Sequence, residues 1–241
     1  MKIGYVYDAG GRSLNEDALL YRESLFKAGT LALAAVCDGM GGMDEGEAAS
    51  SLCISELEDF YDHVLIPFIT DCGQKGRHFR RALDIKMIAV FKKINDLLFE
   101  RMRREKVFSG STMTVCLMFN DRYRIYHIGD SRAYRLMDIP GLKTVFFLRT
   151  KDDIRDKKLS RCVGLNRDHK PQIRGGYFKK GGMLICSDGF YKRCDERNLK
   201  SALYLTSLTD NTAINKRLSA LCEDVKKRGE KDNITAIMIV K

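Results

Sequence analysis

Hydrophobic residues at the start of the chain follow patterns typical of β-strands. Residues 3–7 and 18–21 are short strand-like segments on either side of a turn at Gly10-Gly11. A continuous apolar run over residues 30–37 then leads into Asp38-Gly39. Since an apolar run of this length before a turn signal is typical of a buried strand, we expect a strand that ends where Asp38 begins a turn.

Two amphipathic helices are predicted after this strand. In the first, which begins near Glu45, apolar residues recur at helical spacing from Leu52 to Leu65. In the second, a similar apolar stripe runs from Phe79 to Leu98. Each stripe covers one face of its helix, so both helices are expected to pack on a core.

The rest of the chain reads mainly as strands with one further helix. The strand-like segments are residues 112–119, 123–128, 133–137, 144–148, 183–186 and 234–240, and a helix is predicted near residues 212–227. Strand groups separated by a helix pair favour the α+β class over regular βαβ alternation. We therefore expect a four-layer α/β/β/α sandwich, in which two antiparallel sheets pack together and helix pairs flank them. With 241 residues and 44% hydrophobic content, residues 1–241 are expected to form a single domain.

Positive charge is concentrated in the second predicted helix. The chain has a formal net charge of +10, and residues 77–106 contain ten basic and four acidic side chains. We interpret this segment as a solvated helix face; the alternative is a docking surface for acidic or phosphorylated partners. The segment lacks interleaved exposed aromatic residues and a recognised nucleic-acid-reader motif, so we predict no nucleic-acid partner.

No segment predicts a membrane span or an export signal. The first residues are mixed in polarity, and the longest aliphatic stretch, residues 31–37, is too short to cross a bilayer. The eight cysteines include no C-x-x-C pair, which argues against a zinc knuckle. We therefore expect a cytoplasmic protein with reduced thiols and no membrane partner, while the even number of cysteines leaves disulfides as an alternative.

Acidic side chains lie beside the predicted strand ends at several points. They are Glu16, Asp17, Asp38, Asp130, Asp188 and Asp232. A carboxylate at the mouth of a strand suits a hard divalent cation, which prefers oxygen ligands. Several carboxylates can converge only where bound cations offset their repulsion. Each Asp-Gly pair taken singly is more typical of a turn, so the interpretation depends on the whole set.

Seven short motifs include or separate these carboxylates. In chain order they are Arg12-Ser-Leu-Asn-Glu-Asp17, Val36-Cys-Asp-Gly-Met-Gly-Gly42, Glu45-Gly-Glu-Ala-Ala49, Gly110-Ser-Thr112, Ile128-Gly-Asp-Ser-Arg132, Leu184-Ile-Cys-Ser-Asp-Gly189 and Lys231-Asp-Asn-Ile-Thr235. In this order they resemble the type 2C, metal-dependent Ser/Thr protein phosphatases, and more closely the compact bacterial members of that family. The resemblance spans nearly the whole chain.

The resemblance implies a centre that holds two Mn²⁺ or Mg²⁺ ions. Asp38 would bridge the two ions, and the carbonyl of Gly39 would complete the shell of one. Asp188 and Asp232 would hold the other ion. Two such ions share a water molecule and lower its pKa, so that it can attack phosphorus. Asn233 would orient Asp232, or would serve only as a turn residue before the last strand.

The resemblance also implies more peripheral roles. Glu16 and Asp17 would act mostly through waters around the ions. Asp130, helped by Asp188, would match a third, weaker cation site. Arg12 matches the arginine that grips the substrate phosphate, a task that suits its planar guanidinium.

Two features depart from the family pattern. Met40 stands where many eukaryotic members carry a histidine that is proposed as the general acid, so the group that protonates the leaving oxygen stays open. Bacterial members usually place a longer mobile flap near residues 150–171. Here we expect that segment to be shortened or rebuilt.

The function that the resemblance implies is hydrolysis of phosphoserine and phosphothreonine in proteins. The partners would be phosphoprotein substrates, including a Ser/Thr protein kinase or its targets. The alternative is a catalytically silent pseudophosphatase that binds phosphoproteins. Missing metal carboxylates would mark such a relative, and none of the expected ligands is missing.

Overall fold

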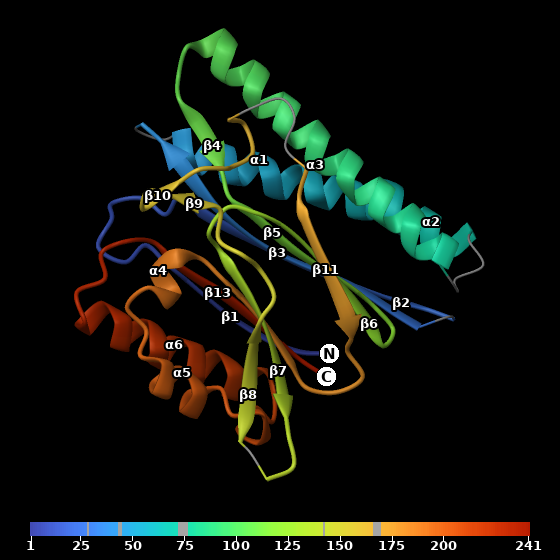
Figure 1. The fold of residues 1–241 in the computed structure, drawn as a ribbon, viewed down its shortest axis with the longest axis vertical. Coiled ribbons are helices and arrows are strands. Elements are labelled where there is room, and N and C mark those ends of the chain that lie inside the picture. The colour runs from blue at the N-terminus through green and yellow to red at the C-terminus, as the bar shows by residue number, and fades with distance from the viewer. Residues whose placement is uncertain (28, 43–44, 72–76, 142, 166–169) are drawn as a thin grey trace.

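Two antiparallel sheets form the centre of the molecule (Figure 1). The computed structural model describes residues 1–27, 29–42, 45–71, 77–141, 143–165 and 170–241. The first sheet has the order β1-β13-β12-β7-β8, formed by Lys2–Asp8, Ile234–Val240, Gly182–Cys186, Arg132–Asp138 and Thr144–Leu148. The second has the order β11-β6-β5-β3-β2, formed by Gln172–Tyr177, Arg122–Ile128, Met113–Phe119, Gly29–Gly41 and Asp17–Phe26, and the short strand β4 (Ser109–Ser111) pairs with β3.

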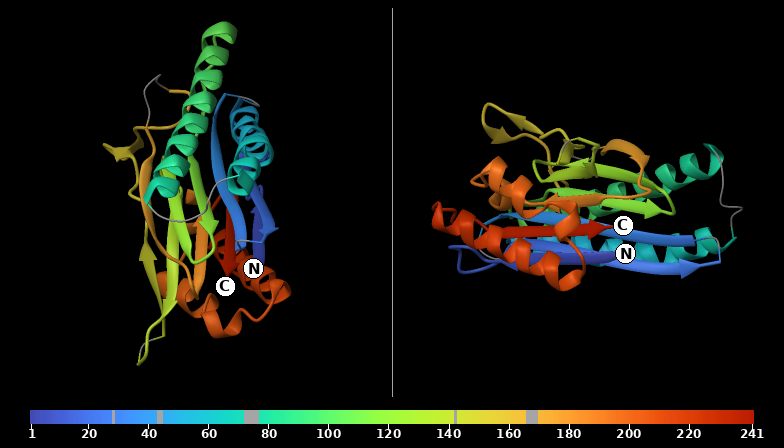
Figure 2. Two further views of the ribbon diagram at one scale, coloured as in Figure 1. Left: turned by 90° about the vertical axis from the view of Figure 1, so that its right-hand side faces the viewer. Right: turned by 90° about the horizontal axis from the view of Figure 1, so that it is seen from below.

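Helices cover the outer face of each sheet, as Figures 1 and 2 show from three directions. On the second sheet lie α1 (Glu45–Phe60), its continuation through a π-helical turn (Tyr61–Leu65) into α2 (Ile66–Asp71), and α3 (Arg77–Glu105). On the first sheet lie α5 (Glu196–Ala202), a 3₁₀ turn (Leu205–Ser207) and α6 (Asn211–Lys227). The predicted α+β sandwich of two antiparallel sheets is confirmed.

The continuous apolar run in β3 is explained by its position between two hydrophobic layers. Leu33 and Ala35 belong to the core under α1 and α3, whereas Ala34 and Val36 belong to the core between the sheets. Successive side chains of a strand point to opposite faces, so a strand buried on both faces must be apolar at every position. The row that faces the other sheet continues toward Asp38, which directs that carboxylate to the end of the inter-sheet core.

The segment where a flap was expected contains a small hairpin. Its strands are β9 (Ile154–Arg155) and β10 (Lys158–Leu159), which pair in antiparallel register. Asp156 and Lys157 between them have positive φ angles of 50° and 63°. Positive φ at both central residues is the geometry of the two-residue turn that matches strand twist. The sequence pattern predicted neither this hairpin nor β11, and residues 166–169 of the same segment lie outside the described part of the chain.

Several basic residues of α3 form ion pairs rather than an open basic surface. Lys93 lies 2.6 Å from Glu56, Arg101 lies 3.0 Å from Glu45, and Lys92 lies 2.6 Å from Asp96. Partly exposed pairs of this kind contribute little to stability and are typical of a solvated surface. They agree with the interpretation of this segment as a solvated helix face.

The described cysteines are all free thiols, and Cys72 lies outside the described residues. Among the residues that the structure covers, no helix combines the length and the apolar character needed to cross a bilayer.

Two isoleucines of α3 test the packing of this helix on the sheet. Ile94 is fully buried, whereas Ile85 is 59% exposed on the same helix. We expect Ile94→Ala to lower the free energy of unfolding by roughly 2–5 kcal/mol, because it leaves a cavity. Ile85→Ala should change it by no more than about 0.5 kcal/mol. Urea unfolding of both variants provides the measurement, and equal losses would contradict the packing described here.

Candidate metal centre

The predicted acidic residues gather at one end of the sandwich. Asp17 is the first residue of β2, and Glu16 precedes it. Asp188 opens the short helix α4 (Asp188–Tyr191) directly after β12, Asp130 follows β6, and Asp232 lies in the loop before β13. Both sheets therefore contribute carboxylates to the same end of the space between them.

Asp38 lies inside a strand, so the prediction of a turn at Asp38-Gly39 is wrong. Strand β3 continues to Gly41 because Gly39 and Gly41 pair with Ser111 and Ser109 of β4. The Thr112 amide donates to the Asp38 carbonyl at 2.8 Å, and the Asp38 amide donates to the Thr112 hydroxyl at 3.0 Å. The extension fixes the Asp38 backbone by hydrogen bonds on both of its polar groups.

Asp17 and Asp38 stand directly opposite each other in the β2–β3 ladder. Opposed residues of an antiparallel pair project to the same face, so two carboxylates share one small space. Burial, together with the charges of Asp188 and Asp232, raises the pKa of Asp17 to about 7 against the lowering effect of its hydrogen bonds. Burial, followed by the charge of Asp17, raises the pKa of Asp38 well above its ordinary value. Without a cation, these two groups resist carrying negative charge together.

One oxygen of the Asp17 carboxylate has a partner and the other does not. Oδ2 accepts a hydrogen bond from the Ser187 hydroxyl at 2.9 Å. Oδ1 is buried and has no hydrogen-bond partner among the described residues. A buried polar atom without a partner costs free energy unless something binds it. A hard cation or a water held by one would satisfy this oxygen, so the donor set fits the group that the resemblance implies.

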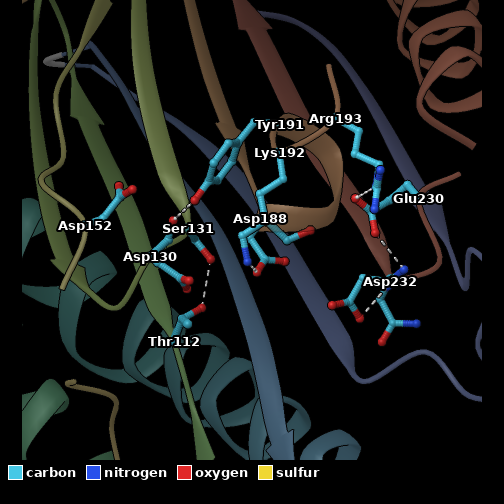
Figure 3. Close-up of polar contacts among 12 residues, drawn as sticks. Thr112, Asp130, Ser131, Asp152, Asp188, Tyr191, Lys192, Arg193, Glu230 and Asp232 are labelled. Carbon is cyan, nitrogen blue, oxygen red and sulfur yellow. Dashed lines mark hydrogen bonds and ion pairs between the residues drawn. The ribbon is translucent and has the colours of Figure 1, made fainter. Parts of the chain in front are cut away.

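The remaining carboxylates are partly matched by basic side chains. Lys192 donates from Nζ to Oδ2 of Asp188, and Nη2 of Arg12 lies 3.1 Å from Oδ1 of Asp232. Asp130 is 7% exposed, and burial together with the charge of Asp188 raises its pKa to about 6. Figure 3 shows Lys192 reaching Asp188, with Asp130 and Asp232 on either side.

Glu16 is held by the backbone rather than by the other carboxylates. Its carbonyl accepts from the Gly39 amide at 3.0 Å, and its own amide donates to Oδ1 of Asn233 at 2.8 Å. Its side chain lies against Gly46, where an added Cβ would come within 2.3 Å of Oε1. A larger residue at Gly46 would therefore require the Glu16 side chain to shift at the first turn of α1.

Asn233 anchors the loop that carries Arg12 and Glu16. Its Nδ2 donates to the carbonyls of Ala9 and Leu14, and its amide donates to Oδ1 of Asp232 at 3.0 Å. The contact to Asp232 comes from the main-chain amide, so an orienting role of the Asn233 side chain stays a prediction, while Asn233 does directly precede β13. The larger role is one that the sequence did not suggest, which is to hold residues 9–16 beside β13.

A cleft of about 480 Å³ opens over these residues. Its lining includes four of the predicted ligands, Asp38, Asp130, Asp188 and Asp232. Met40, Thr112 and Lys192 complete one side, and Ile154, Lys157 and Leu159 of the β9–β10 hairpin form another. The hairpin therefore borders the acidic cleft, where the flap was expected.

The predicted carboxylates lie at one end of the sandwich, but their oxygens do not form a compact cluster. Within the described residues, no three of the predicted ligands bring their oxygens within 4.8 Å of one another. The group that does so consists of Asp8, Cys222 and Glu223, where Lys226 already contacts both acids at 3.2 and 3.0 Å. Mutual repulsion of like charges explains the wider spacing around Asp38.

Comparison with known proteins supports the resemblance stated from the motifs. No protein-family model matches the chain. The serine/threonine protein phosphatase PstP of Mycobacterium tuberculosis is 25% identical over 228 residues, which cover 86% of this chain and 40% of PstP. A putative protein phosphatase of Mycoplasma pneumoniae is 23% identical, with 86% of this chain and 84% of that protein covered. The chain thus spans about two fifths of the length of PstP.

Solved structures give the same answer for the fold. The catalytic domain of PstP in complex with two manganese ions has a TM-score of 0.75 and 25% identity, and the match covers 98% of this chain and 96% of that one. The serine/threonine phosphatase Stp1 of Staphylococcus aureus has a TM-score of 0.77 and 21% identity, with 100% and 95% covered. The chain has the fold of the bacterial serine/threonine phosphatases. The predicted resemblance to type 2C phosphatases is confirmed.

Within this phosphatase fold, the sequence did not single out several residues that shape the site. Thr112 and Ser187 belong to the sequence motifs, but only the structure shows that they are hydrogen-bond partners of Asp38 and Asp17, respectively. The sequence pattern also did not single out Lys192, although its position four residues after Asp188 predicts that the two side chains lie on one face of a helical turn.

The raised pKa of Asp17 predicts a pH dependence for the metal-free phosphatase fold. Its ordinary value is 3.8 and its value in the folded chain is about 7. Between these values the folded state holds a proton that the unfolded state has released. The free energy of unfolding should therefore fall as pH rises from about 4 to about 7, since each pKa unit corresponds to about 1.4 kcal/mol.

Asp17→Asn should flatten this decline, whereas Asp96→Asn, at an exposed position of α3, should leave it in place. Urea unfolding at several pH values with a chelator present provides the measurement. An identical slope in the wild type and in Asp17→Asn would contradict the assignment.

Proposed function

We propose that residues 1–241 form the catalytic domain of a metal-dependent Ser/Thr protein phosphatase. The observation that carries the proposal is the convergence of carboxylates from both sheets on one cleft, with Asp17 and Asp38 forced side by side. Such an arrangement is costly without cations and favourable with them. Its similarity to the catalytic domain of PstP, which binds two manganese ions, supports the same cofactor here.

The ligand roles are those that the resemblance implies, and the lining of the cleft by Asp38, Asp188 and Asp232 supports them. Asp38 and the Gly39 carbonyl would hold one Mn²⁺ or Mg²⁺ ion, and Asp38, Asp188 and Asp232 the other. Asp17 and Glu16 lie behind this group and would orient waters around the ions. When bound, the ions supply a water molecule of lowered pKa as the nucleophile.

Arg12 would bind the substrate phosphate. Its side chain is 56% exposed at the rim, and it lies beside Asp232. A guanidinium binds two phosphate oxygens at once, which orients the ester for attack. The pairing with Asp232, which lines the cleft, supports this role.

The substrates that fit this proposal are phosphoserine and phosphothreonine in other proteins, including a Ser/Thr kinase or its targets. The relatives are named as serine/threonine protein phosphatases, which supports the class of substrate. We propose a cytoplasmic location with neither a nucleic-acid nor a membrane partner. The free cysteines among the described residues support this location.

The metal dependence can be tested with Asp38. With p-nitrophenyl phosphate and a phosphothreonine peptide, the wild type should turn over in Mn²⁺ and stop when a chelator is added. Asp38→Ala should lose roughly 1,000-fold or more, because loss of a bridging ligand exceeds the about 10–100-fold cost of losing an outer partner. Asp96→Ala, which alters an exposed aspartate, should retain the wild-type rate. No turnover by the wild type with any divalent cation would leave the pseudophosphatase interpretation ahead.

Arg12 predicts a different kinetic signature. Arg12→Ala should raise KM for p-nitrophenyl phosphate by roughly 10–100-fold, since a hydrogen bond to a charged group contributes about 1.5–3 kcal/mol. Arg12→Lys should recover part of this loss, because it keeps the charge but not the planar fork. A large fall in kcat at unchanged KM would show that Arg12 acts only in the transition state.

A further inference from the structure

Lys192 brings an ammonium group into the acidic cleft. It follows Asp188 by four residues, and its amide donates to the Asp188 carbonyl at 2.8 Å in the last turn of α4. This spacing places both side chains on one face of the turn, where Nζ bonds Oδ2 of Asp188. The lysine side chain is about half exposed, whereas Asp188 is 13% exposed. The Lys192 side chain therefore extends from the solvent-exposed side, and its ammonium group contacts a carboxylate that lines the cleft.

Asp130 is a second carboxylate in the cleft that Lys192 lines. Lys192, Asp130 and Asp188 all line the 480 Å³ cleft, and the lysine interacts electrostatically with both aspartates (Figure 3). Asp130 and Asp188 are the pair that the resemblance assigned to a third, weaker cation. In this chain the cleft that both carboxylates line already contains a positive charge.

The surrounding contacts hold Lys192 and Asp130 in this relation. The Tyr191 hydroxyl, one residue before Lys192, donates to the Asp130 carbonyl at 2.9 Å. The Arg132 guanidinium lies 3.8 Å from the centre of the Tyr191 ring and pairs with Asp152 at 2.8 Å. Asp152, a further acid beside this part of the cleft, therefore has its own cation. These contacts join α4 to the segment after β6 and limit how far Lys192 can move from Asp130.

The balance of charges at this end of the sandwich also favours two cations together with the Lys192 ammonium group. Five aspartates, namely Asp17, Asp38, Asp130, Asp188 and Asp232, meet at this end of the sandwich. Glu16 adds a sixth carboxylate, and Arg12 already pairs with Asp232. Two divalent cations, Arg12 and Lys192 therefore supply six positive charges for six carboxylates, whereas a third divalent cation beside Lys192 would meet direct repulsion. One carboxylate can also serve both partners, since Oδ2 of Asp188 contacts Lys192 and Oδ1 stays available to a metal ion.

We propose that Lys192 replaces a third divalent cation between Asp130 and Asp188, so that the loaded protein binds two ions. This inference rests on the proposed two-cation centre and adds a role to a residue outside it. Lys192 acts as a positioning residue: it contacts the outer oxygen of Asp188 and offsets the charge of Asp130. Asp130 is then a partner of an ammonium group rather than a metal ligand.

Counting bound Mn²⁺ tests the proposal without an activity assay. The metal-stripped wild type, titrated with Mn²⁺ by calorimetry and checked by electron paramagnetic resonance, should bind about two ions per chain. Lys192→Met keeps the aliphatic stem and removes the charge, so it should bind about three ions, the additional one more weakly. Lys192→Arg keeps a positive charge and should bind about two.

Two further variants make the count specific. Lys192→Met combined with Asp130→Asn should return to about two ions, because the additional site requires the Asp130 carboxylate. Lys200→Met, on the exposed surface of α5, should match the wild type. Thermal unfolding of each metal-free variant verifies that the fold is retained.

The outcomes separate this inference from the proposed function. Three ions in the wild type, or an unchanged count in Lys192→Met, would overturn the role of Lys192 and leave the two-cation centre in place. A wild type that binds no Mn²⁺ would overturn the proposed function itself.

Discussion

The repulsion between Asp17 and Asp38 is the constraint on which the rest of the site depends. The two residues are opposed in one ladder, so no change of rotamer can carry them far apart while the strands stay paired. Burial removes the water that would otherwise screen their charges, and it raises the pKa of both groups. The β2–β3 pairing therefore concentrates negative charge at this point, and the site depends on nearby positive charges or cations that offset it.

The packing of the two sheets determines which side chains lie close enough to Asp17 and Asp38 to interact with them. Alternate residues of β3 face the first sheet, and at the end of that row the apolar side chains give way to Asp38. Strands β12 and β13 end or begin at the same level, which brings Ser187, Asp188 and Asp232 across the gap. The Ser187 hydroxyl crosses it to Asp17 at 2.9 Å. The packing of two sheets thus assembles a centre from residues that are more than two hundred positions apart in sequence.

The sequence could predict the parts of this arrangement that local patterns encode. The strands, the long helices and the carboxylates beside strand ends follow from periodicity and turn residues, and their order along the chain pointed to the family. The extension of β3 through Gly41 could not be predicted, because it depends on β4, a partner about seventy residues away. The β9–β10 hairpin was also missed, since its two-residue strands carry no periodic signal and Asp156-Lys157 is not a glycine turn.

Lys192 was missed for a related reason. A lysine four residues after an aspartate is common in sequences. The relation of Lys192 to the cleft follows only from the short helix α4 and from the bond between Tyr191 and Asp130.

The charge of the whole chain and the charge of the cleft have opposite signs, which explains why a lysine at the cleft matters. The chain is strongly basic overall, with a net charge of +10, which favours the approach of phosphorylated, acidic partners over long range. The cleft itself is acidic and would repel the same phosphate at short range unless cations occupy it. Under the proposed function, positive charge held at the cleft by Arg12, Lys192 or a bound metal ion would offset this repulsion and let the cleft accept a phosphate ester.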